Sequence, residues 1–267
     1  MIQINKISKS YGKRVLFDDV TFSINPKERL GLVGRNGHGK STLFKILANI
    51  EQCDSGDIHY PEDYSIGYLQ QTLEFKEATV LDEASLALPE LEGGWKELHK
   101  AEEILLGLGF LKEQFSISPL ELSGGFQIRL NLAKLIISSP DLLLLDEPTN
   151  YLDIVSMRWL TKFIKNWQSE LILITHDHDF LNRVCTHTLG IHRKKIKKLE
   201  ANTEKFFELL ELQEELQEQQ RVNQEKKIKQ TEQFINRFRA KNTKAKAVQS
   251  RIKACLLYTS PSPRDRG

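Results

Sequence analysis

The amino-acid sequence predicts an α/β fold in which short apolar strands form a parallel sheet and end at a common ligand-binding edge. Residues 30–33 form an apolar run that leads into a glycine-rich loop and then into a segment with helical spacing. Residues 142–145 are four consecutive leucines, typical of a central strand covered on both faces, and residues 171–174 form a third such run. Strand, glycine loop and helix in this order are the context that a phosphate-binding loop requires.

The glycine-rich loop matches the pattern G-x-x-x-x-G-K-[ST], and its residues are Gly34, Arg35, Asn36, Gly37, His38, Gly39, Lys40, Ser41 and Thr42. Its glycines allow backbone N–H groups to turn toward an anion, and the following helix adds the positive end of its dipole. Lys40 supplies a charge for the β- and γ-phosphates, and the Ser41 hydroxyl suits Mg²⁺. The loop therefore predicts a nucleoside triphosphate site, with His38 as an exposed residue and not a catalyst. The alternative is a glycine turn before a helix.

Composition narrows the class of protein. The chain has 267 residues, 40% of them hydrophobic, which is enough for one substantial core and an appendage. No run of 18 apolar residues occurs and the first ten residues lack the apolar core of a signal peptide, so we expect no membrane span. The three scattered cysteines fit a reducing cytosol, and we expect a cytoplasmic protein.

The segments around the loop predict two smaller parts. Alternating apolar residues indicate a hairpin that turns at Tyr11-Gly12, the basis of an antiparallel β subdomain. Short strands are expected at residues 2–7, 15–24, 57–59 and 65–70. Residues 80–111 are acidic, rich in leucine and interrupted by glycines, which indicates a small helical subdomain.

Carboxylates and a histidine follow the two other apolar strands. Asp146 and Glu147 come directly after the leucines, at the carboxyl end where an α/β sheet binds its ligand. We expect Asp146 to hold Mg²⁺ and Glu147 to take a proton from the attacking water; the alternative is a solvated acidic pair before a turn. His176 follows the third strand and is expected at the same edge. His176 and His178 with their aspartates also suit a metal site, although no further ligand pair has suitable spacing.

A second glycine-bounded helix begins at Ser123-Gly124-Gly125. Ser123 suits the N-cap position, and the N–H groups of Gly124 and Gly125 offer a second anion site. The apolar stripe of this helix includes Ile128, Leu132, Leu135 and Ile136.

Together these motifs resemble an ATP-binding cassette (ABC) ATPase. They are the Walker A loop at 34–42, the signature Leu122-Ser123-Gly124-Gly125, the strand and carboxylates at 142–147, and His176 as the switch histidine. The unbroken run DEPTNYLD at 146–153 resembles subfamily F (ABC-F), whose members usually have histidine where this chain has Tyr151. The resemblance implies a P-loop cassette that binds and hydrolyses ATP with Mg²⁺, in a subfamily without membrane spans.

The resemblance also assigns roles that the residues alone do not. It makes Tyr11 the aromatic that stacks on the base, Gln71 the Q-loop ligand near Mg²⁺, and Asp153 the D-loop aspartate. In such ATPases two cassettes close head to tail, so Ser123 would cap the ATP of a second cassette rather than the phosphates at Lys40. The partner would be a second copy or the other half of a longer protein, and full ATPase activity would need it.

The C-terminal part of the chain differs sharply in charge. Residues 1–220 carry 25 Lys/Arg against 33 Asp/Glu, whereas residues 221–253 carry 11 against 2, and such asymmetry indicates an anionic partner. A helix is expected from 204, with a turn at Asn242-Thr243 and a sparse apolar stripe of Phe206, Leu209, Leu210, Leu212 and Leu216. A solvated coiled-coil face is the alternative for this charge run. The similarity of 234–253 to the subfamily F linker implies contact of residues 221–253 with the ribosome and tRNA.

The expected organisation is a cassette at 1–200 with a helical and signature subdomain at 72–140, a basic linker at 201–254, and a tail at 255–267. The Pro- and Ser-rich tail is unlike the expected linker helix, and we interpret it as a non-native extension of an N-terminal half. Only about fifty residues separate Gln71 from the signature, so the longer helical arm of some family members is not expected. Two other functions remain open: a DNA-associated ATPase, and the ATPase subunit of a separate transporter.

Overall fold

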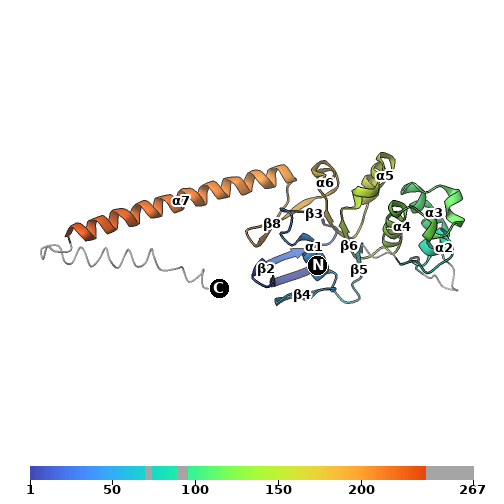
Figure 1. The fold of residues 1–267 in the computed structure, drawn as a ribbon, viewed down its shortest axis with the longest axis horizontal. Helices are drawn as coiled ribbons and strands as arrows, with labels where there is room; N and C mark the ends of the chain where they lie inside the picture. The colour runs from blue at the N-terminus through green and yellow to red at the C-terminus, as the bar shows by residue number, and fades with distance from the viewer. Residues whose placement is uncertain (70–73, 90–95, 239–267) are drawn as a thin grey trace. The chain divides into compact units, whose positions relative to one another are not determined.

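The computed structural model describes residues 1–69, 74–89 and 96–238 (Figure 1). The chain divides into two units between Phe206 and Phe207. The first unit contains both sheets and all the shorter helices. The second contains most of one long helix. Among the described residues, no helix combines the length and apolar character needed to cross a membrane.

The larger sheet has six strands in the order β5-β6-β7-β3-β8-β9, and all but the last pair are parallel. The strands are β3 (Arg29–Val33), β5 (Ile66–Tyr68), β6 (Leu142–Asp146), β7 (Glu170–Ile174), β8 (His187–His192) and β9 (Lys195–Leu199). The predicted α/β class and parallel sheet are confirmed. The leucines of β6 are fully buried between β5 and β7, as a continuous apolar strand requires.

The smaller sheet is antiparallel, in the order β2-β1-β4. Its strands are β1 (Ile2–Tyr11), β2 (Arg14–Ile24) and β4 (Ser55–His59). The predicted turn at Tyr11-Gly12 is wrong by one residue, because Tyr11 still pairs with Arg14 and the turn lies at 12–13. Lys9 interrupts the alternation of apolar residues that predicted the first strand at 2–7. Its side chain is buried and paired with Glu51 at 2.9 Å, and the strand continues beyond the predicted end.

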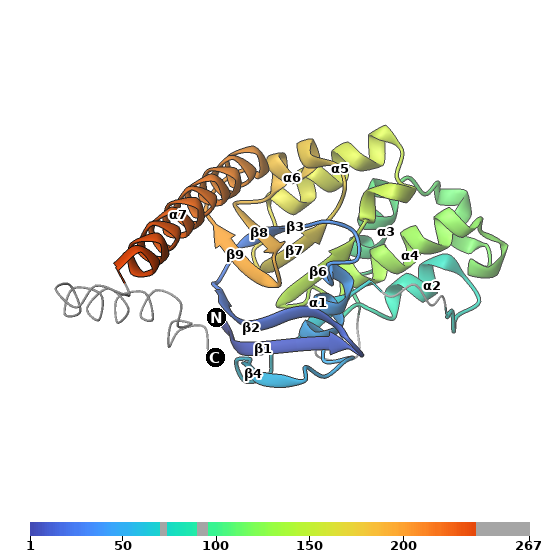
Figure 2. The same ribbon diagram turned by 60° about the vertical axis from the view of Figure 1, so that its left-hand side comes forward.

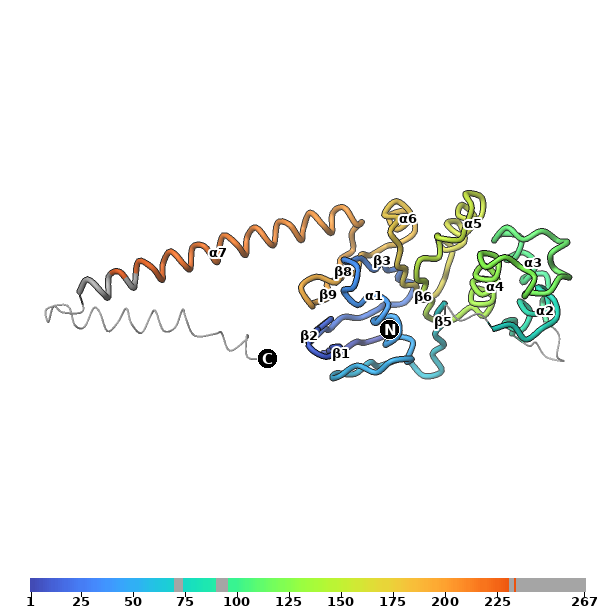
Figure 3. Tube along the Cα trace, viewed as in Figure 1, coloured from blue at the N-terminus to red at the C-terminus, as the bar shows by residue number. Residues whose placement is uncertain are grey.

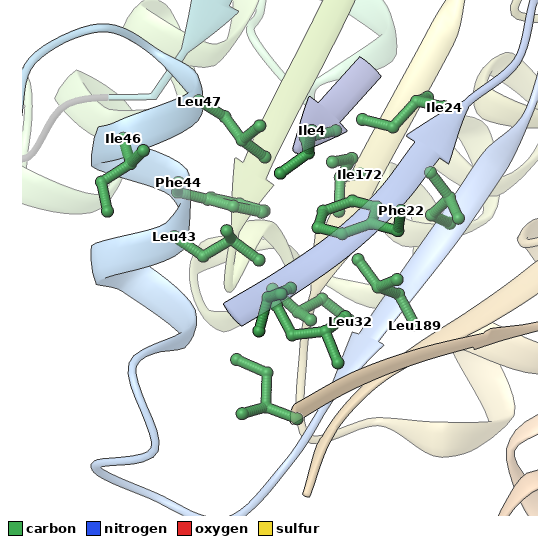
Figure 4. Close-up of a cluster of buried hydrophobic side chains, with 14 of the residues drawn as sticks. Ile4, Phe22, Ile24, Leu32, Leu43, Phe44, Ile46, Leu47, Ile172 and Leu189 are labelled. Carbon is green, nitrogen blue, oxygen red and sulfur yellow. The ribbon is translucent and has the colours of Figure 1, made fainter. Parts of the chain in front are cut away.

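One hydrophobic core joins the two sheets. Helix α1 (Lys40–Leu47) contributes Leu43 and Phe44, both fully buried, between strands of the two sheets. Figure 4 shows these side chains beside Phe22 of β2 and Ile172 of β7. Each such buried side chain contributes about 1.5–3 kcal/mol relative to its exposed state, so burial fixes α1 in the core between the two sheets.

Helices cover the opposite face of the larger sheet. α5 (Ile154–Lys165) and α6 (His178–Val184) lie there (Figure 2). A Cβ at Gly31 of β3 would lie 3.2 Å from Leu181 of α6, so this helix and strand pack closely.

The predicted helical part consists of α2 (Val80–Ser85), α3 (Leu98–Gly107) and α4 (Gly124–Ile137), which pack against one another (Figure 3). Short 3-10 helices at Lys112–Ser116 and Pro119–Glu121 connect α3 to α4. The predicted stripe of α4 is only partly right: Leu132 and Ile136 are buried, whereas Ile128 and Leu135 are partly exposed. The remaining buried residues of this helix are Leu130, Ala133 and Ile137.

Helix α7 (Thr203–Phe238) forms one continuous helix of 36 residues, as expected from residue 204 onward. Leu212 and Leu216, placed on its apolar stripe by the sequence, are about half exposed in the second unit. The predicted turn at Asn242-Thr243, the basic residues beyond Phe238 and the tail at 255–267 lie outside the described residues.

Candidate functional site

The glycine-rich loop joins β3 to α1 in the predicted order. Gly39 is the N-cap of α1 with φ 94°, and Gly37 has φ 77°, a region that favours glycine. A Cβ at Gly39 would lie 3.1 Å from both Leu16 and Phe17, so the loop is also too close to β2 for a side chain there. The loop thus presents the N-terminus of α1, with its free N–H groups and positive dipole end, to a neighbouring anion.

Lys40 and Ser41 begin the helix and point to different partners. The Lys40 ammonium donates to the carbonyl oxygen of Gly34 at 2.8 Å, so it lies against the loop itself. The Ser41 hydroxyl donates to Asp146 Oδ2 at 2.8 Å, which joins the start of α1 to the end of β6. Residues 105 positions apart therefore meet at one edge of the sheet, as the sequence predicted.

Glu147 and His176 lie at the same edge. Glu147 has φ 50°, and its N–H donates to the Ile174 carbonyl at 2.8 Å, which fixes it beside the end of β7. The His176 N–H donates to Glu147 Oε2 at 3.4 Å, and His176 Nε2 lies 3.4 Å from Oε1. The Glu147 side chain is 21% exposed and that of His176 is 71% exposed, so the carboxylate is shielded while the imidazole reaches solvent.

A cavity of about 510 Å³ gathers most of these residues. It is lined by Tyr11, Arg14, Leu16, Asn36, Gly37, Gly39, Lys40, Ser41, Thr42, Asp146, Glu147, Ile174 and His176. Its volume falls within the range of small-molecule and cofactor sites. Gly34, Arg35 and His38 belong to the loop but are not among its lining residues.

Three lining residues, Arg14, Leu16 and Ile174, were not among the predicted site residues, and the first two lie on the hairpin. The Arg14 guanidinium donates to the Gly37 carbonyl at 2.7 Å, so β2 supports the loop from the side. Leu16 lies against Gly39. Arg14 and Leu16 follow Tyr11 on the hairpin. The role expected for Tyr11 was the only sequence signal that pointed to this part of the cavity.

Tyr11 forms one wall of the cavity and is half exposed. Its hydroxyl donates to Glu51, and the Lys9 ammonium lies 5.3 Å from the centre of its ring. The hydrogen bond to Glu51, followed by burial, raises the pKa of Tyr11 above 10.0, so the phenol stays neutral. A fixed, neutral ring at the mouth suits the stacking role expected for Tyr11.

Comparisons with known proteins identify the family. A profile described as "ABC transporter" matches residues 17–150, which hold the loop and both carboxylates, and a second with that description matches 189–255. The chain belongs to the ABC transporter family. It is 36% identical over 283 residues to "Probable ATP-binding protein YheS" of Escherichia coli K12, covering 95% of this chain and 44% of that protein. It is 32% identical to "ATP-binding cassette sub-family F member 3" of rat, covering 99% and 42%, and the predicted subfamily is confirmed.

The solved structures support the same fold. An ABC cassette described as "Structure of ATP binding subunit of ABC transporter" has a TM-score of 0.63 at 23% identity, covering 75% of this chain and 90% of that one. A dimeric cassette bound to ADP and Pi has a TM-score of 0.62 at 20% identity, covering 75% and 98%. The chain spans about half the length of the curated relatives it matches. It is therefore an ATP-binding cassette of the ABC ATPases, with about half the length of its subfamily F relatives.

Other expected residues of the ABC cassette lie outside this cavity. Ser123 is the N-cap of α4 as predicted, but its side chain makes no capping hydrogen bond. Gly124 and Gly125 have open space where a Cβ would stand. Asp153 is the N-cap of α5 and accepts a hydrogen bond from the Ser156 N–H at 2.9 Å. Gln71 lies outside the described residues.

The donor set of the cavity fits Mg²⁺ and ATP. A hydroxyl and a carboxylate oxygen 2.8 Å apart, Ser41 Oγ and Asp146 Oδ2, are the hard ligands that Mg²⁺ takes beside phosphate oxygens and water. In the part of the chain that is described, no three His, Cys, Asp or Glu side chains cluster as a metal site, which removes support from the alternative at His176 and His178.

Proposed function

We propose that this cassette hydrolyses Mg-ATP in the cytoplasm and that the protein containing it acts on the ribosome during translation. The cavity that brings Lys40, Ser41, Asp146, Glu147 and His176 together carries the chemical part of this proposal. The basic residues at 221–253 and the resemblance of residues 234–253 to the subfamily F linker support the ribosomal part.

The residues divide the work by position. Lys40 and the N–H groups at the start of α1 hold the phosphates, which places the γ-phosphate toward the ends of β6 and β7. Ser41 and Asp146 would hold Mg²⁺, which would neutralise part of the phosphate charge. Glu147, shielded and fixed by the Ile174 carbonyl, accepts the proton of the attacking water, and His176 orients Glu147 and reaches the γ-phosphate. Tyr11 stacks on the base, Gln71 approaches the metal, and Asp153 acts at the interface between cassettes.

A second cassette completes the site in this proposal. Ser123, Gly124 and Gly125 do not line the cavity, and their open surroundings leave room for the phosphates of another cassette. The exposed residues Ile154 and Val155 follow Asp153, and exposed apolar side chains of this kind suit a protein interface. Dimeric cassettes among the structural neighbours show that this architecture associates in pairs. The partner is a second copy or the remaining half of a longer protein.

The linker gives the proposed RNA contact. Residues 221–253 carry nine more basic than acidic side chains (11 against 2), a density that suits phosphate backbones more than a protein surface. Contact would depend on charge and shape, because lysine and arginine on phosphates carry no sequence information. A DNA-associated ATPase would use the same residues, so binding must be compared directly.

The experiment uses Glu147→Gln, which keeps the side-chain shape but removes the proton acceptor. We expect this variant to cosediment with ribosomes in ATP and to release them in ADP, and we expect weaker binding to duplex DNA at matched salt. A matched control replaces Lys241, Lys244 and Lys246 with glutamine, which should weaken cosedimentation without changing Mg-ATP binding. Stronger binding to DNA than to ribosomes would overturn the ribosomal proposal. A wild-type chain that does not bind Mg-ATP would overturn the enzymatic proposal.

A further inference from the structure

Arg129 on α4 is almost buried and is bonded to two separate backbone segments. Its Nε donates to the Tyr151 carbonyl at 2.7 Å, and its Nη1 donates to the Leu108 carbonyl at 3.1 Å. Its side chain is 11% exposed, so these bonds form largely away from water. The guanidinium carbon also lies 4.7 Å from the centre of the Phe126 ring, one turn earlier on the same helix. With an ion pair to Asp153, four contacts hold this long side chain in a single conformation.

The fourth contact is an ion pair with Asp153. Arg129 Nη1 lies 3.1 Å from Asp153 Oδ2, while Asp153 Oδ1 accepts the Ser156 N–H and caps α5. The hydrogen bond from the Ser156 N–H is the main cause that lowers the pKa of Asp153 below its ordinary value of 3.8. The hydrogen bond and positive charge of Arg129 lower this pKa further. Asp153 therefore stays ionised at neutral pH and joins the start of α5 to α4.

The surrounding packing is built for this arrangement. Gly109 has φ 88°, and a Cβ there would lie 2.7 Å from Ser156 Oγ and 2.8 Å from Arg129 Nη1. Both the backbone conformation and the lack of space reserve this position for glycine. The turn after α3 thus packs closely against the guanidinium.

One short 3-10 turn joins the Tyr151 carbonyl, which Arg129 contacts, to the backbone of Glu147. Tyr151 ends the 3-10 helix Pro148–Tyr151, whose N-cap is Glu147. The Asn150 N–H donates to the Glu147 carbonyl at 3.3 Å, and the Leu152 N–H donates to the Thr149 carbonyl at 3.2 Å. Ser123, the N-cap of α4, lies less than two helical turns before Arg129.

We propose that Arg129 is a positioning residue that holds the loop from Glu147 to Asp153 on the signature helix α4 of the same cassette. Movement of α4, when its N-terminus meets the phosphates of another cassette, is thereby transmitted to Glu147. The inference rests on the proposed function, in which Glu147 accepts the proton and Ser123 faces a second cassette. Arginine suits this position because its planar fork serves Tyr151, Leu108 and Asp153 at once, which a lysine ammonium cannot reproduce.

The test compares Arg129→Lys with Arg158→Lys, a matched change at an exposed arginine of α5. Each is made in the full chain and assayed at concentrations where two copies associate. For Arg129→Lys we expect Kd for Mg-ATP and KM to stay within twofold of wild type, while kcat falls about 10- to 100-fold because Glu147 is misplaced. Arg158→Lys should match wild type. Asp153→Asn, which keeps the cap but loses the charge, should show a smaller fall in kcat.

A second measurement does not depend on turnover. Hydrogen exchange of the Asn150 and Leu152 amides should be about tenfold faster in Arg129→Lys, while the amides of α1 exchange as in wild type. Failure of the wild-type chain to bind or hydrolyse Mg-ATP would overturn the proposed function. Unchanged kcat in Arg129→Lys, or unchanged exchange at these two amides, would overturn the positioning role alone.

Discussion

The buried ion pair between Glu83 and Lys134 gives the sharpest stability prediction. Glu83 on α2 is fully buried and accepts hydrogen bonds from the backbone N–H groups of Lys76, at 2.7 Å, and Glu77, at 2.8 Å. Its other oxygen accepts from the ammonium of Lys134 on α4. One carboxylate therefore ties two helices and a loop segment of the helical part together.

The perturbation is Glu83→Gln, which keeps the size of the side chain. The amide oxygen can still accept from the two backbone N–H groups, but the amide nitrogen would face the Lys134 ammonium, donor against donor. Removing one partner of a buried pair costs about 3–5 kcal/mol. Because the Lys134 side chain is 25% exposed and keeps some water, we expect a loss of about 3 kcal/mol in the free energy of unfolding.

The effect depends on pH in a defined direction. Burial alone would raise the pKa of Glu83, but Lys134 and the N–H groups of Glu77 and Lys76 outweigh it and lower the pKa below 4.5. A lowered pKa in the folded state means that the contribution is fully present above about pH 4.5 and is lost as the pH falls through the folded value. The difference between wild type and Glu83→Gln should therefore shrink toward acid pH.

The assay is urea unfolding of the chain, followed by tryptophan fluorescence at pH 7 and at pH 4. Lys100→Gln, which removes an exposed ion pair with Glu97, is the control and should leave the free energy of unfolding close to that of wild type, because exposed pairs contribute little. A Glu83→Gln variant within 0.5 kcal/mol of wild type at pH 7 (about the scatter of surface substitutions) would refute the reasoning.

Three further predictions concern the reaction, the packing and a thiol. Glu147→Gln should lower single-turnover phosphate release about 10²- to 10⁴-fold while Mg-ATP still binds, and wild-type turnover in this variant would exclude Glu147 as the proton acceptor. Gly190→Ala should lower the free energy of unfolding by about 1–3 kcal/mol, since the new Cβ would lie 2.1 Å from the Phe206 ring; an unchanged Tm would contradict this. Burial raises the pKa of Cys185 to about 12, so iodoacetamide at pH 8 should label Cys53 faster, as peptide mapping would show; equal rates would contradict it.

The sequence was most informative where one short segment contains both the fold signal and the chemistry. The loop before Lys40 and the leucines before Asp146 carry apolar strands and polar ends in a single run, so their meeting at one sheet edge could be predicted. Strand β8 and the edge strand β9 had no such signal. β9 reads as a charge run, and it forms a strand because it pairs with β8 and buries Ile196 in the core.

Long-range polar contacts were invisible for a related reason. Arg14 supports the loop through the Gly37 carbonyl, and Glu83 meets Lys134 across 51 positions, yet neither pair has a spacing rule that links its members. Such contacts are created by the packing of whole elements, so only the three-dimensional structure reveals them.

The central claim is that the cavity at the start of α1 holds a triphosphate, and calorimetric titration of the chain with Mg-ATP tests it most directly. We predict binding by wild type and by Lys45→Ala, an exposed lysine on the same helix, with equal affinity. Lys40→Ala should bind at least about tenfold more weakly, because a charge-assisted hydrogen bond contributes about 1.5–3 kcal/mol. No binding heat from folded wild-type chain, or equal affinity in Lys40→Ala, would contradict the assignment.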